Sequence, residues 1–158
     1  MREIGTDAFY GCKSLTRVKF ARGSKLEKIG SGSFCETGIE RVVVPKSVEK
    51  IREHAFRRCE DLKEVLIEAG SALKTIGEEA FNYCSNLTKT TFPEGLEEIG
   101  IGAFARSGLE NVEFPTSLRT IAQASFNECT SLKAVKFNEG LEVLGTDECD
   151  GSMYYGVF

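Results

Sequence analysis

Three stretches of the sequence hold residue types that could do chemistry, and the first is rich in glycine. The segment from Gly100 to Ala105 (GIGAFA) matches Gly-x-Gly-x-x-Ala, which binds the pyrophosphate of a dinucleotide when it joins a strand to a long helix. The same slot recurs along the chain as Ile-Gly-x-x-Ala-Phe without the second glycine, as at Ile76 and Gly77. A structural repeat therefore explains the match, and we predict no nucleotide or other cofactor.

The second and third stretches hold a histidine and a group of carboxylates. His54 is the single histidine, and no serine or cysteine is marked out as a nucleophile for it to activate. Asp147, Glu148 and Asp150 resemble a calcium loop, but they lack the alternating ligands and the distal glutamate of an EF-hand. We therefore expect solvated side chains at both places, no catalytic or metal-binding residues, and a chain that is not an enzyme.

The six cysteines raise two alternatives, a disulfide framework or buried thiols. They are Cys12, Cys35, Cys59, Cys84, Cys129 and Cys149. Four of them occupy one slot of the repeat described below, which favours free thiols that act as small apolar side chains. No Cys-x-x-Cys pair occurs, so a structural zinc site is not expected.

The elements that carry these stretches repeat about every 23 residues. The aliphatic residue ahead of each Ala-Phe pair recurs at Ile4, Ile29, Ile51, Ile76, Ile99, Ile121 and Leu144. Such a period is typical of stacked repeats, in which no unit can bury its apolar face alone. We predict a single domain, 1–158, with six repeats (4–28, 29–50, 51–75, 76–98, 99–120 and 121–143) and a truncated seventh with an inserted loop (144–158).

Each repeat contains a short strand and a second short segment. Val18 and Phe20 alternate with polar neighbours, which is the two-residue period of a strand with one buried face. Strands that run the same way, one repeat apart, must pair in parallel. The Ala-Phe segment favours a single helical turn on the opposite side, where each phenylalanine packs on the next. Two repeats are one residue shorter, at Gly38 and Gly108, where glycine can tighten the path.

These slots resemble the BspA-like class of leucine-rich repeats over residues 4 to 144. The pattern Ala-Phe-x-x-Cys is intact from Ala55 to Cys59 and from Ala80 to Cys84, and the strands follow Leu-x-x-Val-x-Phe. The resemblance implies an α/β repeat solenoid, right-handed, with a parallel β-sheet on its concave face and short helical turns or short strands elsewhere. It also implies a secreted or cell-surface adhesion protein. The chain shows no signal peptide or transmembrane run, so a cytoplasmic location stays open.

Specific recognition is expected from the outward strand positions, because these do not repeat. The predicted binding surface consists of Arg17, Lys19, Arg41, Val43, Glu64, Leu66, Lys89, Thr91, Asn111, Glu113 and Lys136. Val43 and Leu66 are apolar where solvent is expected, and an apolar centre with a charged rim is typical of a protein-binding patch. The alternative is a sheet that tolerates scattered apolar residues.

We therefore expect a non-enzymatic module that binds a protein or a cell or matrix surface. A structural spacer of a larger repeat protein is the alternative, and an enzyme is a remote third hypothesis. The formal net charge of −4 gives no reason to expect nucleic acid or membrane insertion. Uncapped repeat ends at Phe9 and Phe158 predict self-association. Asn86 begins a glycosylation sequon, which matters only in a secreting eukaryote.

Overall fold

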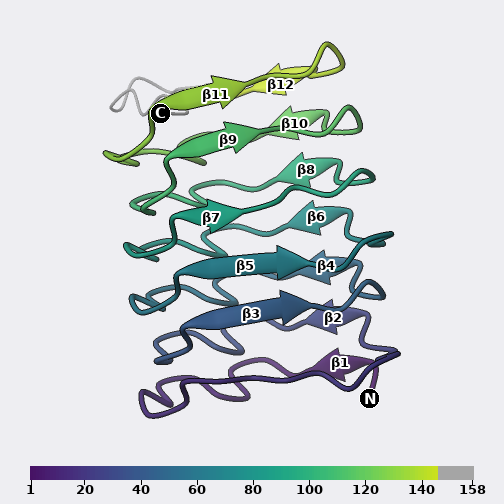
Figure 1. Ribbon diagram of the computed structural model, residues 1–158, viewed down its shortest axis with the longest axis vertical. Coiled ribbons are helices and arrows are strands. Elements are labelled where there is room, and N and C mark those ends of the chain that lie inside the picture. The colour runs from purple at the N-terminus through teal and green to yellow at the C-terminus, as the bar shows by residue number, and fades with distance from the viewer. Residues whose placement is uncertain (146–158) are drawn as a thin grey trace.

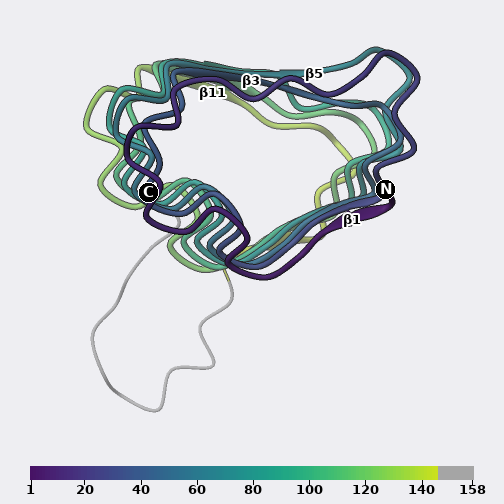
Figure 2. The same ribbon diagram turned by 90° about the horizontal axis from the view of Figure 1, so that it is seen from below.

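The computed structural model describes residues 1–145, which form a β-solenoid of six turns (Figure 1). The turns stack along one axis, with the first turn at one end and β11 and β12 at the other (Figure 1). When the solenoid is viewed along this axis, successive turns follow a common outline (Figure 2). Strands β3, β5 and β11 lie on one side of that outline and β1 lies on another, so each turn contributes to two separate sheets.

Two-residue strands form a continuous seven-stranded parallel sheet, in the order β1-β2-β4-β6-β8-β10-β12. They are β1 (Glu3–Ile4), β2 (Lys28–Ile29), β4 (Lys50–Ile51), β6 (Thr75–Ile76), β8 (Glu98–Ile99), β10 (Thr120–Ile121) and β12 (Val143–Leu144). Each ends on the aliphatic residue that marks the repeat. That side chain is buried from Ile4 to Ile121 and exposed at Leu144. We call this the isoleucine sheet.

Longer strands form the second surface, which we call the strand face. They are β3 (Arg41–Val44), β5 (Glu64–Ile67), β7 (Lys89–Thr90), β9 (Asn111–Glu113) and β11 (Ala134–Lys136). Strands β3, β5 and β7 form one parallel sheet and β9 and β11 form another, while Arg17 joins Arg41 through an isolated parallel bridge. The predicted parallel sheet is therefore present, but it is divided between β7 and β9.

The division falls beside one of the two shortened turns. A Cβ atom at Gly38 would lie 2.4 Å from the Lys13 carbonyl oxygen, and one at Gly108 would lie 2.4 Å from that of Ser85. The backbone at these glycines thus packs closely against the backbone of the preceding turn. The strand that follows each one pairs poorly with that preceding turn: Arg41 makes a single bridge, and β9 does not pair with β7. Pairing from a shortened turn to the next full turn is the most extensive, with four residue pairs for β3–β5 and three for β9–β11.

No helix occurs in residues 1–145, so the predicted α/β class is wrong. The Ala-Phe segment instead forms tight turns in which the residue before alanine and the second residue after phenylalanine have positive φ, as at His54 (57°) and Arg58 (56°). A right-handed helix excludes such angles. The segment is held to the next turn by bonds from His54 N to Glu78 O, Phe56 N to Ala80 O and Arg58 N to Asn82 O, each 2.8 Å long.

The phenylalanines of these segments form one column through the core, as predicted. From Phe9 to Phe126, neighbouring rings are stacked with centroids 5.1 to 5.5 Å apart. The rings between these two ends are fully buried, whereas Phe9 is 42% exposed because it begins the column. Stacking of this kind adds to the stabilisation from burial, so the column is the main core element of the solenoid.

The cysteine slot lies beside this column, and its thiols make hydrogen bonds. The Sγ atoms of Cys59, Cys84 and Cys129 donate to the Phe34, Phe56 and Phe104 carbonyl oxygens of the preceding turns, at 3.0 to 3.1 Å. These three cysteines are buried, which confirms the prediction of buried thiols at these positions, whereas Cys12, in the same slot of the first turn, is exposed. Burial raises the pKa of the Cys59 thiol to about 11 and also raises the pKa values of the other two thiols.

In the shortened turns a hydroxyl group takes over the cysteine slot. The Thr37 Oγ1 atom lies 3.2 Å from Cys59 Sγ, and the Ser107 Oγ atom lies 3.3 Å from Cys129 Sγ. Both residues are buried. The column of small hydrogen-bonding groups therefore continues through the shortened turns, because a hydroxyl can donate to a carbonyl as a thiol does.

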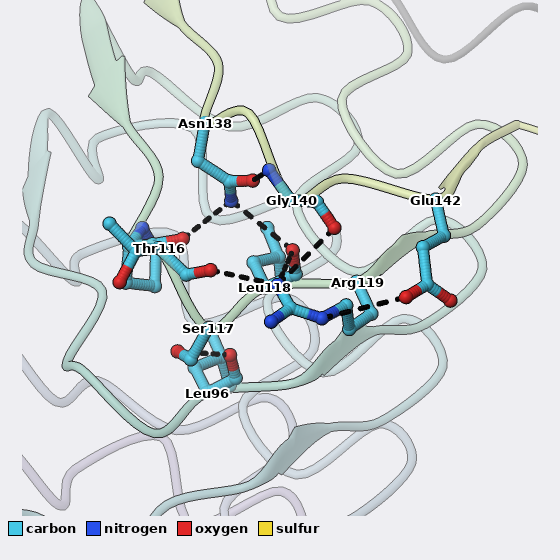
Figure 3. Close-up of polar contacts among 9 residues, drawn as sticks. Leu96, Thr116, Ser117, Leu118, Arg119, Asn138, Gly140 and Glu142 are labelled. Carbon is cyan, nitrogen blue, oxygen red and sulfur yellow. Dashed lines mark hydrogen bonds and ion pairs between the residues drawn. The ribbon is translucent and has the colours of Figure 1, made fainter.

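Side-chain hydrogen bonds also close the corner between the strand face and the isoleucine sheet (Figure 3). The Arg119 Nη1 atom donates to the Thr116 carbonyl oxygen at 2.8 Å and to that of Gly140, in the next turn, at 3.2 Å. The Asn138 side chain donates to the Leu118 carbonyl oxygen at 3.2 Å and accepts from the Gly140 N–H at 2.7 Å. These bonds satisfy backbone groups that the loop leaves without a strand partner.

Candidate binding surface

The first half of the strand face carries a chain of charges across β3, β5 and β7. The Arg41 Nε atom lies 2.8 Å from Glu64 Oε2, and the Lys89 Nζ atom lies 3.7 Å from Glu64 Oε1. Strand register places these three residues side by side. The Glu64 side chain is 26% exposed, so both attractions are partly screened by solvent. The carboxylate shared by two cations leaves this half with a net positive charge.

An apolar pair lies beside this chain. Val43 and Leu66 are register partners on β3 and β5, on the same face as Arg41 and Glu64. The Val43 side chain is exposed and Leu66 is half-buried. Two neighbouring apolar side chains with charged residues next to them offer a small contact for an apolar group of a partner.

The second half of the strand face is hollowed across β7, β9 and β11. The hollow has a volume of about 510 Å³ and is lined by Thr90, Thr91, Phe92, Asn111, Val112, Glu113, Ala134, Val135 and Lys136. Small side chains line part of it, at Thr90, Thr91 and Ala134. It lies across the division between the two sheets of the strand face.

The structure places the eleven predicted residues on this one surface, but in three groups. Arg17 and Lys19 are exposed in the first turn, outside the named strands. Arg41, Val43, Glu64, Leu66 and Lys89 lie on the three-stranded sheet. Thr91 directly follows β7, and Asn111, Glu113 and Lys136 lie on β9 and β11, where Glu113 and Lys136 form an ion pair. The three groups differ in charge and shape. The alternation of inward and outward residues along each strand did not reveal this difference.

A second cluster on the surface was missed in the sequence. The Tyr83 ring lies between two guanidinium groups, with its centroid 5.2 Å from Arg58 Cζ and 4.7 Å from Arg106 Cζ. Arg106 also donates to both carboxylate oxygens of Glu128, at 2.8 Å each. Aligning the second residue after each phenylalanine would have placed all four in one column. Both faces of the ring are covered, so this cluster stabilises neighbouring turns and offers a ligand little aromatic surface.

The other candidate sites of the sequence have structural roles or make ordinary surface contacts. His54 occupies the positive-φ slot before Ala-Phe, and its Nε2 atom lies 3.5 Å from Glu79 Oε2, an atom that Arg57 Nε also approaches at 3.0 Å. Gly102 occupies the same slot with φ 58°, so the segment from Gly100 to Ala105 is a repeat turn. The Asn86 side chain is exposed and donates to the Glu60 carbonyl oxygen at 2.8 Å.

Asp147, Glu148 and Asp150 lie outside the described residues. Among residues 1–145 no group of three or more histidine, cysteine, aspartate or glutamate residues could hold a metal ion. In that same part of the chain, no helix is long and apolar enough to span a membrane.

Stacked turns with a parallel sheet, an aromatic column and a cysteine slot define the class: a β-solenoid of the leucine-rich-repeat type. The chain belongs to the family of the BspA type leucine rich repeat region, whose model matches residues 1–72 and 66–153 with six copies. A search of curated proteins gives no match.

Solved structures show similar solenoids. The T. pallidum leucine rich repeat protein TpLRR is 31% identical, with a TM-score of 0.81 over 89% of this chain and 65% of its own. A leucine rich cell surface protein from Faecalibacterium prausnitzii is 27% identical, with a TM-score of 0.64 over 89% of this chain and 37% of its own. The pneumococcal vaccine antigen PcpA, at 21% identity and a TM-score of 0.67 over 89% of this chain and 49% of its own, shares the fold. The chain thus spans less than two thirds of the length of each of these proteins.

Proposed function

We propose that the chain is a non-enzymatic recognition module that binds a protein ligand through the strand face. The observation that carries the proposal is the contrast between the two sides of the same strands. Inward side chains such as Val42 and Val65 repeat and are buried in one core, whereas outward side chains differ from turn to turn. Packing explains the first set. The second set, with an apolar pair beside a hollow, has the features of a surface that selects a partner.

The charges of this surface favour one kind of ligand. Five of the eleven outward residues are cations and two are carboxylates. A ligand surface with acidic groups facing β3 and the first turn would complement this excess, and nucleic acid is disfavoured by the overall acidic charge of the chain. The F. prausnitzii relative is a leucine rich cell surface protein, which supports a secreted or cell-surface setting; adhesion in that setting is part of this proposal.

The test is binding to a panel of purified extracellular-matrix proteins and intact host cells, measured by biolayer interferometry and cell adhesion. For each ligand that the wild type binds, Leu66→Asp and Arg41→Asp are expected to weaken affinity at least about tenfold, or about 1.4 kcal/mol. Lys50→Asp, on the exposed side of the isoleucine sheet, is the matched control and should bind as the wild type does. Thermal unfolding by circular dichroism checks that all three variants fold. Equal binding by the Leu66 and Lys50 variants would contradict the assignment of the site.

A structural spacer within a longer repeat protein is the second candidate. It is supported by the isoleucine sheet, which continues unbroken through all seven strands, and by the greater length of the related proteins. A spacer would bind no member of the panel, while fused neighbouring domains would lose their fixed separation when turns are deleted.

We also infer self-association through the first turn. Phe9 and Tyr10 are exposed there, and the Phe9 ring stacks on Phe34 with one face only. Exposed aromatic side chains favour contact with a second apolar surface. Light scattering at increasing protein concentration should show particles larger than a monomer, and Phe9→Lys should reduce them. A monomer throughout would contradict this inference.

A further inference from the structure

The hollow on the strand face offers neutral hydrogen-bonding groups to a ligand. Its two charged residues, Glu113 and Lys136, form an ion pair with each other. The Thr91 hydroxyl and the Asn111 carboxamide make no hydrogen bond with residues 1–145. A carboxamide supplies two donors and one acceptor, and a hydroxyl supplies a donor and acceptors. These groups are arranged over the division between β7 and β9.

A peptide main chain matches these groups better than other ligands do. Each peptide group carries one donor and one acceptor, which an asparagine side chain can bind together. A charged ligand would have to compete with the ion pair for its partner. A sugar ring would be expected to stack on an open aromatic face, whereas Phe92, which lines the hollow, is half-buried and packs against Phe104 and Phe114.

We propose that the hollow binds the main chain of an extended, uncharged peptide segment, and that Val43 and Leu66 hold an apolar side chain of the same segment. The proposal rests on the proposed function, since it names the part of the protein ligand that the strand face recognises. Asn111 and Thr91 are the positioning groups for the main chain, and the apolar pair is the anchor.

The dimensions of the strand face fit a short segment. Five strands from β3 to β11 span roughly 19 Å at about 4.8 Å per strand spacing, which is the length of about six residues at about 3.3 Å each. The apolar side chain would lie over β3 and β5. About three residues would then cross the hollow over β7, β9 and β11.

Such a segment would also join two parts of the surface that are otherwise separate. The outward ion pairs stay within one sheet or the other: Arg41, Glu64 and Lys89 on the first, Glu113 and Lys136 on the second. A ligand that contacts Leu66 and Asn111 together bridges the division. Its binding should therefore slow amide hydrogen exchange at residues 90–92 and 111–113, on both sides of the division.

The experiment selects ligands from a phage library of random linear twelve-residue peptides on the intact chain, then measures synthetic peptides by fluorescence polarisation. We expect a shared motif of one apolar residue followed by small neutral residues. Leu66→Asp should abolish binding, and Asn111→Leu should weaken it about tenfold, because the peptide group then loses its partner. Thr120→Leu, on the isoleucine sheet, is the matched control and should leave the affinity within about twofold.

A charge exchange tests whether the peptide segment over the hollow is uncharged. The double variant Glu113→Lys with Lys136→Glu keeps both the ion pair and the net charge, so it should keep affinity within about threefold. Loss of binding in this variant would overturn the neutral ligand. Enrichment of no linear peptide, or binding to a glycan array alone, would overturn the peptide proposal. If Leu66→Asp weakens protein binding while Asn111→Leu does not, this inference fails and the proposed function stands.

Discussion

The isoleucine sheet and the strand face are built from the same turns, yet one is continuous and the other is divided. The isoleucine sheet pairs two residues in every turn, without a break from β1 to β12. The strand face pairs as many as four residues between β3 and β5 and none between β7 and β9. More extensive local pairing has therefore not produced the more regular sheet.

The difference lies in where the turns vary in length. The shortened turns lose their residue between phenylalanine and the next apolar slot, at Gly38 and Gly108, directly before the strand face. The close approach of these glycines to the turn before them is followed by weak or absent pairing on that side. The isoleucine sheet keeps its register throughout. Regularity on one side thus permits variation on the other, which is the side of the proposed ligand surface.

The largest expected effect comes from the column that both sheets share. Phe56 is fully buried and stacks on Phe34 and Phe81 at 5.2 Å each. Phe56→Ala should lower the free energy of unfolding by about 3–5 kcal/mol, because it removes a buried ring and leaves a cavity. Val43→Ala on the exposed strand face should change it by less than about 0.5 kcal/mol. Urea unfolding of both variants measures the contrast, and similar losses would show that the strand face belongs to the core.

Because several thiols are buried, we expect alkaline pH to lower the free energy of unfolding. Burial raises the pKa of Cys59 from 9.0 to about 11, so the folded state favours the protonated thiol. This stabilisation is complete below about pH 9 and is lost as the pH rises through about 11; it amounts to at most about 2–3 kcal/mol. Urea unfolding between pH 8 and pH 11 should show a shallower loss in Cys59→Ser, whose hydroxyl replaces the thiol. Equal slopes for the variant and the wild type would rule out this cause.

Gly108→Ala tests how much the shortened turn depends on close packing at its glycine. The added Cβ atom would lie 2.4 Å from the Ser85 carbonyl oxygen, so the turns must move apart, at a cost of about 1–3 kcal/mol. Gly5→Ala is the control, because no atom lies within 4 Å of its Cβ position. Thermal unfolding compares the two variants. If both behave alike, the shortened turn does not depend on close approach at glycine.

The smallest effect concerns the positive-φ slots on the regular side. Ala124 has φ 54°, which costs an alanine about 1–2 kcal/mol and a glycine little. Ala124→Gly should therefore stabilise the fold by about 0.5–1 kcal/mol, after the greater entropy of the unfolded glycine is subtracted. Ala122→Gly, two residues earlier and without positive φ, should destabilise it by a similar amount. Opposite signs in thermal unfolding are the expected result, and two losses would contradict it.

The repeat, its apolar slots and the phenylalanine column could be predicted from the sequence because they depend on residue type at fixed spacing. The conformation of the Ala-Phe turns could not be predicted from the sequence. Residues other than glycine, such as Asp7, Glu79 and Ala124, fill most of their positive-φ slots, so the usual signal for such angles is missing and a helical turn was wrongly expected. The alternating pattern identified the outward residues. It could not show the division or the hollow, because both depend on how turns of unequal length meet in space.

The eleven ion pairs among residues 1–145 all join one turn to the next. Beside the isoleucine sheet, for example, Lys74 pairs with Glu97 and Arg119 pairs with Glu142. Among turns of equal length the core would accept any order, since their apolar slots are alike. The surface would not, because exchanging the turns of Lys74 and Glu97 would place Lys74 beside Arg119. These ion pairs thus favour the native order of the turns at the positions where they form, although like charges also meet in register at Lys28 and Lys50.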